Sequence, residues 1–232
     1  MNDFSHRSQL PEKMDEADVP FREIHQALNE LETINRLLGG YHVILNALDQ
    51  LQWSKKPVTI MDLGCGGGDM LRAIAKWAAK KGRNVNLIGV DRNQVMINFA
   101  SGKSTSFSNI RFVCADVFDD VLLNENADVV MSSLFCHHFD DPDLIVLMQR
   151  MNLLASKAVI VNDIHRHWLA YYLIKFLSWA FSKTYLVKYD APLSVARSLT
   201  RSEWESILLK AKLSGFMLRW MWAWRWQLII KK

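Results

Sequence analysis

The order of apolar and polar residues predicts a helical beginning to the chain. Residues 21–38 place apolar side chains at helical spacing, and the pair Gly39-Gly40 ends that pattern, as glycines often do after a helix. A second short helix is expected at about 41–52. Together these helices predict an N-terminal helical cap, or lid, over residues 1–55.

From residue 56 onward, compact runs rich in β-branched residues alternate with helical patterns. The expected strands are 58–63, 84–91, 110–116, 127–133 and 157–163, and the expected helices are 69–82, 93–100 and 141–155. Alternation of this kind predicts an α/β fold with a parallel sheet and helices on both faces. The strands read as continuous apolar runs, which is typical of strands buried on both faces. We expect residues 56–232 to form one structural unit with the cap.

Two further apolar segments follow. In the C-terminal tail, tryptophans alternate with other residues from Trp220 to Trp226, a period of two that predicts a strand whose Trp face packs on helices. Residues 168–181 (WLAYYLIKFLSWAF) are apolar nearly all round, so this helix should be buried or should face lipid or an oily ligand. It is too short to span a bilayer. We favour a core helix under a lid, within a substrate wall over about 164–200.

Composition narrows the class of protein. The chain has 232 residues, half of them hydrophobic, and a net charge of +4 from scattered lysines and arginines, which does not indicate a nucleic-acid partner. Cys65, Cys114 and Cys136 form no CxxC pair, so we expect a reducing compartment and no disulfide framework. The polar, acidic start is unlike a secretory signal, and we expect a cytoplasmic protein. Monomer and homodimer both stay open.

A glycine loop, Asp62-Leu63-Gly64-Cys65-Gly66-Gly67-Gly68-Asp69, follows the first expected strand and precedes a helix. A strand, glycine loop and helix in this order form a nucleotide crevice at the carboxyl ends of the strands. A dinucleotide site would have glycine in place of Asp69, and the carboxylates of Asp62 and Asp69 would repel a pyrophosphate. The glycine loop also does not end in the GK[ST] of a phosphate loop. The ligand should lack phosphate and could be cationic, which matches S-adenosylmethionine.

Two more acids end the next two strands. Asp91 is placed to accept ribose hydroxyls, and Asp116 to accept from an adenine amino group. A single Asp at a strand end often only caps a turn. Three acids at successive strand ends beside a glycine loop favour a binding site over three separate caps.

The motifs DLGCGGGD, GVDRN, CADVF and MSSLFCHHFDD resemble the class I S-adenosylmethionine-dependent methyltransferases over about residues 56–163. The resemblance implies a Rossmann-like seven-stranded sheet ending in an antiparallel hairpin, a slot that the Trp-rich tail would fill. The tail departs from this pattern because WMWAWRW contains no Gly, Asn or Pro for a tight turn. INRLLGG, SLFCHHF and VNDIHRHWLAYY also resemble a subgroup related to ubiquinone and menaquinone methyltransferases and often encoded near polyketide synthases.

The resemblance and the crevice together define the expected cofactor site. The cofactor-binding residues are expected to be Asp62, Gly64, Cys65, Gly66, Gly68, Asp91, Arg92, Asp116, Val117 and Ser133.

The acceptor side is expected to contain histidines, because methyl transfer to a hydroxyl needs a base. His137, His138 and His165 are the candidate catalytic residues, although each could equally be a cap or a packing residue. The expected substrate-binding residues are Tyr41, Phe135, Asn162, Arg166 and Tyr171. The pairs HH and HxH, with Asp140 or Asp141, would suit a metal, but no HxxxH or CxxC accompanies them, and we expect none.

The sequence therefore predicts a methyltransferase that uses S-adenosylmethionine on a small hydrophobic acceptor, such as a phenol, pyrone or quinone of the polyketide type in secondary metabolism. The alternatives are a protein that binds the cofactor without turnover and a nicotinamide oxidoreductase, against which Asp69 argues. Transfer to oxygen, carbon or nitrogen stays open. So does a weak peripheral membrane contact aided by Lys183, Lys188, Lys231 and Lys232.

Overall fold

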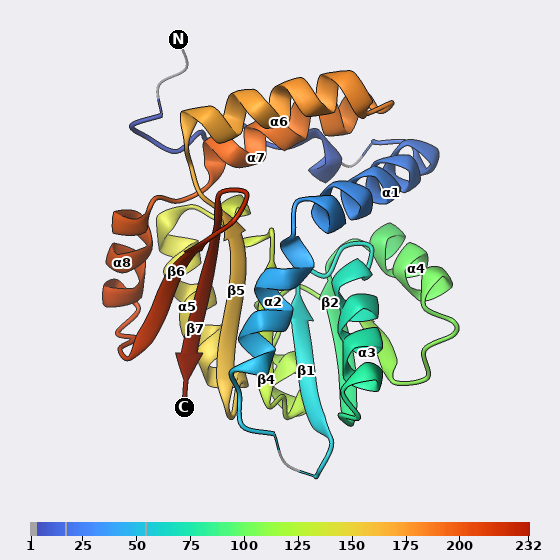
Figure 1. Ribbon diagram of the computed structural model, residues 1–232, viewed down its shortest axis with the longest axis vertical. Coiled ribbons are helices and arrows are strands. Elements are labelled where there is room, and N and C mark those ends of the chain that lie inside the picture. The colour runs from blue at the N-terminus through green and yellow to red at the C-terminus, as the bar shows by residue number, and fades with distance from the viewer. Residues whose placement is uncertain (1–3, 17, 54) are drawn as a thin grey trace.

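A seven-stranded sheet forms the centre of the protein, which is known here from a computed structural model describing residues 4–16, 18–53 and 55–232 (Figure 1). The strands are β1 (Val58–Leu63), β2 (Val85–Asp91), β3 (Ile110–Cys114), β4 (Val129–Ser133), β5 (Ala158–Ile164), β6 (Phe216–Met221) and β7 (Arg225–Lys231). Their order is β3-β2-β1-β4-β5-β7-β6. The pairs among the first five strands are parallel, and β7 runs antiparallel to β5 and β6. The predicted Rossmann-like fold with its antiparallel hairpin is confirmed.

Helices flank this sheet in the order that the hydrophobic periodicity predicted. The α-helices are α1 (Phe21–Leu37), α2 (Gly40–Asp49), α3 (Asp69–Lys80), α4 (Gln94–Lys103), α5 (Asp141–Leu154), α6 (Trp168–Phe181), α7 (Tyr185–Arg197) and α8 (Arg201–Lys210). Three short 3₁₀ helices are η1 (Lys13–Asp15), η2 (Asp120–Glu125) and η3 (Cys136–His138). The helix α8 begins with a capping box formed by Thr200 and Glu203.

Two apolar cores lie on opposite faces of the sheet. Alternate residues of β1 point to different cores, Ile60 toward α2 and α3 and Met61 toward α5 and α8. Trp204 of α8 is fully buried in the second of these cores. Helices on both faces and strands without polar faces are what a parallel sheet needs, because it exposes neither face to water.

The turn between β6 and β7 corrects the expectation of one alternating strand across the tail. Ala223 and Trp224 both adopt left-handed backbone conformations, with φ of 60° and 51°. Hairpin loops usually place Gly or Asn where the backbone is left-handed, because these residues adopt that conformation at low cost. Here Ala223 and Trp224 adopt it, so no typical turn residue in the sequence indicated where the hairpin turns. The break in alternation leaves Trp222 exposed while Trp226 is buried.

Helix α6 corrects a second expectation. We predicted a core helix, but only Ala170 and Ser178 of its residues are buried. Figure 1 shows α6 and α7 lying across the end of the sheet where the parallel strands finish, with α6 on the outside. Among the described residues, no helix is both long and apolar enough to cross a membrane.

The N-terminal segment packs beside α7 rather than forming a separate body. Leu28 of α1 shares a small apolar cluster with Leu186 and Val187 of α7 and with Phe99 of α4. The division at residue 55 stays a prediction, and residues 1–3, 17 and 54 of the expected cap and its border lie outside the described residues.

Candidate active site

A cavity of about 730 Å³ lies at the carboxyl ends of the parallel strands and extends under α1, α6 and α7. That position is where open α/β sheets bind ligands. Nine of the expected cofactor residues line it, namely Asp62, Gly64, Cys65, Gly66, Asp91, Arg92, Asp116, Val117 and Ser133. Three expected acceptor-side residues also line it, namely Phe135, His137 and His138. The structure places Gly68, Tyr41, Asn162, His165, Arg166 and Tyr171 outside the lining.

The glycine loop holds an open, sharply turned backbone against the cavity. Gly66 has a φ of 48°, and a Cβ added there would meet no atom within 4 Å. A side chain at this position would strain the turn and would point into space that a ligand could fill. The Gly66 N–H donates to Oδ2 of Asp91 at 2.9 Å, which ties the loop to the end of β2. At Gly64 the ring of Phe135 lies so close that a Cβ would be 2.3 Å from it.

Gly68 shapes the loop rather than the cavity surface. It is the left-handed N-cap of α3, with a φ of 69°, and its N–H donates to the carbonyl of Cys65 at 2.9 Å. A Cβ there would be 2.9 Å from the ring of Phe112.

Three carboxylates converge below the loop. Asp62 is 1% exposed and its Oδ1 has no hydrogen-bond partner among the described residues. Burial raises the pKa of Asp62 well above its usual range, and the charges of Asp69 and Asp91 raise it further. Burial also raises the pKa of Asp91, although N–H groups of Asn93 and Gly66 offset part of that rise. Crowded, incompletely bonded carboxylates favour a cationic ligand and disfavour a phosphate.

Arg225, the first residue of β7, is a cavity residue that sequence reasoning missed. It is 4% exposed, and its Nε and Nη1 have no hydrogen-bond partner among the described residues. Burial lowers the pKa of Arg225 to about 10. A Cβ on Gly40 would lie 3.2 Å from its Cζ, so the guanidinium packs against the start of α2. A buried cation with unused donors is costly unless an anion meets it. The sequence did not indicate this role, because Arg225 appeared only as one polar position in the alternating pattern of the tail.

Tyr41 lies outside the cavity lining but contacts Asp69, which lines the cavity. Half-burial, and then the charge of Asp69 and a hydrogen bond to it, raise the pKa of Tyr41 far above its ordinary value. Asn35 also donates to Asp69, from Nδ2 to Oδ2 at 3.2 Å. Both side chains orient Asp69, and only Asn35 and Asp69 line the cavity.

The end of β4 meets the cavity through Ser133. Asn162 of β5 is fully buried and donates from Nδ2 to the Ser133 hydroxyl at 2.8 Å. The expectation that Asn162 touches substrate is therefore replaced by a role behind Ser133. The next residue, Leu134, has a φ of 56°, a conformation that is uncommon for a branched apolar residue and reverses the chain into η3.

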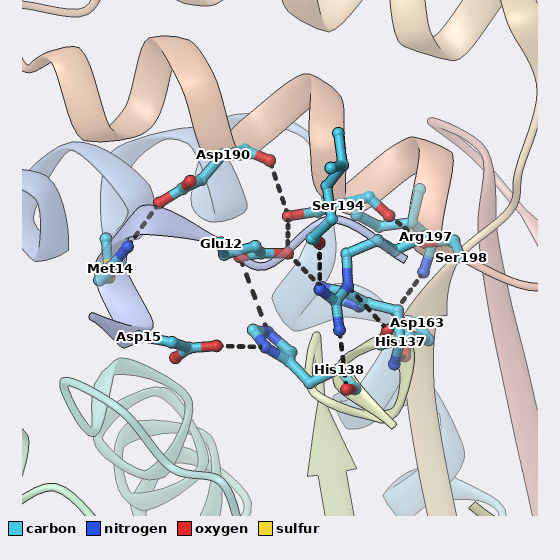
Figure 2. A network of polar contacts seen from close by, with 12 residues as sticks. Glu12, Met14, Asp15, His137, His138, Asp163, Asp190, Ser194, Arg197 and Ser198 are labelled. Atoms are coloured by element: carbon cyan, nitrogen blue, oxygen red, sulfur yellow. Dashed lines mark hydrogen bonds and ion pairs between the residues drawn. The ribbon is translucent and has the colours of Figure 1, made fainter. Parts of the chain in front are cut away.

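A polar network occupies the acceptor end of the cavity (Figure 2). His137 is buried with Nδ1 2.7 Å from Oδ1 of Asp163 and Nε2 3.4 Å from Oε1 of Glu12. Burial alone would lower the pKa of His137, but the two carboxylates outweigh it and raise the pKa to about 10. With a proton on each ring nitrogen, His137 cannot act as a base near neutral pH. The structure therefore assigns it a holding role, because it joins the N-terminal segment to β5.

His138 is the candidate base that the network leaves available. Its Nδ1 lies 3.0 Å from Oδ2 of Asp15, and its side chain is partly exposed to the cavity. Its Nε2 is 3.8 Å from Oε2 of Glu12, which is too far for a hydrogen bond. A carboxylate that accepts a hydrogen bond from Nδ1 favours the tautomer with its proton on Nδ1. In that tautomer Nε2 can accept a proton from the substrate. Glu12 and Asp15 were missed because the sequence assigned the N-terminal segment only to a helical cap, and no motif there indicates a pairing with His137 or His138.

The same network contains the metal-ligand group found among the described residues, Glu12 with His137 and His138. Asp140 and Asp141, considered from the sequence as ligands, do not belong to it. Both nitrogens of His137 face carboxylates, an arrangement that favours a proton over a metal ion at that ring.

The remaining predicted residues lie behind the cavity wall. Arg166 uses all five of its N–H groups within the protein: two on the Glu203 carboxylate and three on the carbonyls of Phe4, Ser5 and Ser198. It therefore has no donor left for a substrate anion. His165 packs against Trp226 at 4.7 Å between ring centroids, and burial lowers its pKa to about 4. Tyr171 packs edge-on against Phe4 at 5.2 Å.

Comparison with known proteins assigns this chain to a family. The family model described as a methyltransferase domain matches residues 54–187, more than half of the chain. A carboxy-S-adenosyl-L-methionine synthase from Helicobacter pylori (strain HPAG1) is 29% identical over 126 residues, 53% of this chain and 49% of that protein. The ubiquinone/menaquinone biosynthesis C-methyltransferase UbiE of Rickettsia prowazekii is 40% identical over 60 residues, 25% of this chain and 24% of that protein. The chain spans about half the length of the first curated relatives it matches.

Solved structures show the same fold at low sequence identity. The plantazolicin methyltransferase BpumL, solved with SAH, aligns over 91% of this chain and 95% of its own with a TM-score of 0.62 and 18% identity. Human N-acetylserotonin methyltransferase, solved with SAM, aligns over 92% of this chain and 56% of its own with a TM-score of 0.65 and 16% identity. With the matched family model, these findings confirm the predicted class: the chain belongs to the methyltransferase domain family.

Proposed function

We propose that this protein transfers a methyl group from S-adenosylmethionine to a small hydrophobic acceptor, a phenol, pyrone or quinone-like compound. One observation supports this choice of cofactor most directly. The Oδ1 of Asp62 is buried without a hydrogen-bond partner among the described residues, and it lies with other carboxylates below an open glycine loop. A ligand with cationic ammonium and sulfonium groups relieves the repulsion between these acids, whereas a dinucleotide's phosphates increase it. The family membership points the same way and disfavours the nicotinamide alternative.

The residues present fit each part of the cofactor. Asp91 at the end of β2 would accept from the ribose hydroxyls, and Asp116 would accept from the adenine amino group. Asp62 and Asp69 suit the α-ammonium group. Arg225 offers its unused Nε and Nη1 donors to the α-carboxylate.

Apolar side chains beyond the cofactor end support an oily acceptor. Leu173, Ile174 and Leu177 of α6 line the cavity, with Phe139 and Val195 contributing from η3's end and α7. A wall of this kind binds aromatic or aliphatic surface and excludes water from the reacting groups.

The chemistry asks little of the protein beyond placement and one proton transfer. The bound cofactor supplies a methyl group on a cationic sulfur, which leaves as a neutral thioether. The cavity walls align the acceptor with that methyl group. For a hydroxyl acceptor, Nε2 of His138 takes the proton while Asp15 holds the ring in place. We also propose a reducing, cytoplasmic compartment for this protein, which its three free cysteines would suit.

The test is a screen of phenols, pyrones and quinones with methyl-labelled S-adenosylmethionine and the full chain. Labelled product is expected for at least one class. Replacing His138 with Ala should lower turnover of a hydroxyl acceptor about 10²–10⁴-fold. The matched control is His42→Ala, because His42 is exposed and outside the cavity lining.

Two results would contradict this proposal. Cofactor binding with no turnover of any acceptor would favour the alternative of a binding protein without catalysis. An unchanged rate in His138→Ala on a hydroxyl acceptor would remove that residue from the proton transfer.

A further inference from the structure

We infer that the outer face of α6 docks on an anionic membrane surface. This aromatic face consists of Trp168, Tyr172, Phe176 and Trp179, extended by Phe181 at the C-terminal end of the helix, and all of them are exposed. Phe176, Trp179 and Phe181 are 60%, 70% and 77% exposed. The first four recur every three or four residues, so they form one stripe along the helix. Soluble proteins rarely leave such a stripe uncovered unless it meets a partner or a lipid.

The composition of the stripe suits the boundary between headgroups and acyl chains. Tryptophan and tyrosine concentrate at this boundary because each has an apolar ring and a polar group. At 14 residues, α6 is about 21 Å long and can lie in the plane of the interface but not span the bilayer. Figure 1 places α6 on the outside of the molecule, and within the described residues the ring of Phe4 packs edge-on at the Tyr172 end of the face.

The charges around the face match an anionic surface. Residues 164–189 contain no Asp or Glu, while Lys175, Lys183 and Lys188 are exposed within that range. Lys13, from the N-terminal segment, lies 4.5 Å above the ring of Tyr189 and adds a fourth cation beside α7. Each lysine near an anionic surface raises binding by about fivefold.

The same charges disfavour a second copy of the chain as the partner. A twofold interface built on the aromatic face would place the same lysines of both copies around one buried patch. Residues 164–189 supply no acid to compensate them, and the neighbouring carboxylate of Glu30 on α1 is already engaged with Ser182, the Lys183 N–H and Thr184. A membrane surface supplies both the apolar layer and the negative charge.

Helix α6 also connects this face to the cavity. Leu173, Phe176 and Leu177 line the cavity and are exposed at the surface as well. An oily acceptor dissolved in the bilayer therefore has an apolar route from the docking face to the site. Docking itself does not depend on methyl transfer, so it can be tested without cofactor or acceptor.

The experiment is flotation of the full chain with pure phosphatidylcholine vesicles and with mixed phosphatidylcholine and phosphatidylglycerol vesicles. The wild-type chain should float with the mixed vesicles and release at high salt. The double variant Trp179→Ser, Phe181→Ser should lose about tenfold or more in binding, because two apolar anchors are removed. Lys183→Glu with Lys188→Glu should lose at least as much.

The controls match these changes on other helices. Leu209→Ser on α8 and Leu153→Ser on α5 remove residues that are 77% and 67% exposed, and both should float like the wild type. Lys210→Glu is the charge control.

Three outcomes would overturn the inference. The first is that the wild-type chain floats with neither vesicle. The second is that the control variants lose as much binding as the α6 variants. The third is that light scattering shows a wild-type dimer that dissociates when Trp179 and Phe181 are replaced. The last outcome would assign the aromatic face to a second copy.

Discussion

Two opposite charges, each incompletely bonded, face the same cavity. Asp62 has a free carboxylate oxygen, and Arg225 has free guanidinium donors. Neither meets the other in an ion pair among the described residues. Because leaving buried charges unpaired costs free energy of folding, their persistence fits a zwitterionic ligand that satisfies both, as the ammonium and carboxylate of a methionine group would.

Replacing Arg225 with Met should weaken binding of S-adenosylmethionine by about 10–100-fold, since a charge-assisted hydrogen bond to a carboxylate is lost. The decarboxylated cofactor should bind equally weakly to wild type and variant, which calorimetry can check. Arg219→Met is the control, because Arg219 is exposed on the neighbouring strand β6. A full loss with the decarboxylated ligand as well would assign Arg225 to folding rather than to the carboxylate.

Replacing His137 with Gln should destabilise the protein by about 3–5 kcal/mol, because Asp163 and Glu12 would keep buried charges without a cation. Urea unfolding measures this loss. An exposed imidazole change, His42→Ala, should alter stability by less than about 0.5 kcal/mol. Comparable small losses in both variants would contradict the ion triad.

The same histidine gives a pH dependence with a defined sign. The folded pKa of His137 is about 10, above its ordinary 6.5, so its contribution is complete below pH 6.5 and is lost as pH rises toward 10. The melting temperature of the wild type should therefore fall by about 5 °C or more between pH 7 and 10, and His137→Gln should show a smaller fall. Parallel curves for the two proteins would show that the ring is not protonated in the folded state.

At the scale of elements, the hairpin between β6 and β7 stores strain at the cavity edge. Ala223 and Trp224 both hold positive φ values, and both line the cavity. The left-handed conformation costs an ordinary residue about 1–2 kcal/mol, and glycine avoids this cost. Neither residue signals a turn in the sequence, so the packing of β7 between β5 and β6 imposes the conformation.

Replacing Ala223 with Gly should raise the free energy of unfolding by about 0.5–1 kcal/mol, since the strain is removed. Ala180→Gly, at an exposed position in the last turn of α6, should lower it, because no positive φ is relieved there. Denaturant unfolding without ligand compares the two. Destabilisation by Ala223→Gly would show that the turn is not strained.

At the scale of the molecule, local patterns predicted the sheet and the cofactor end but not the surfaces made by distant segments. The strand β1 and the glycine loop were predicted because adjacent residues carry their whole signal. The pairing of His137 with Glu12 and Asp163 depends on segments far apart in the chain, so no spacing could indicate it. Helix α6 has the composition of a core helix, and only its place outside α7 reveals an exposed face.

The most direct test of the central claim is calorimetric titration of the full chain with S-adenosylmethionine, with NAD as the comparison ligand. We predict one cofactor bound per chain, no binding of NAD, and loss of cofactor binding in Asp91→Ala, whose carboxylate holds the glycine loop at Gly66. Absence of binding by S-adenosylmethionine and by its demethylated product, or unchanged affinity in Asp91→Ala, would contradict the proposed site.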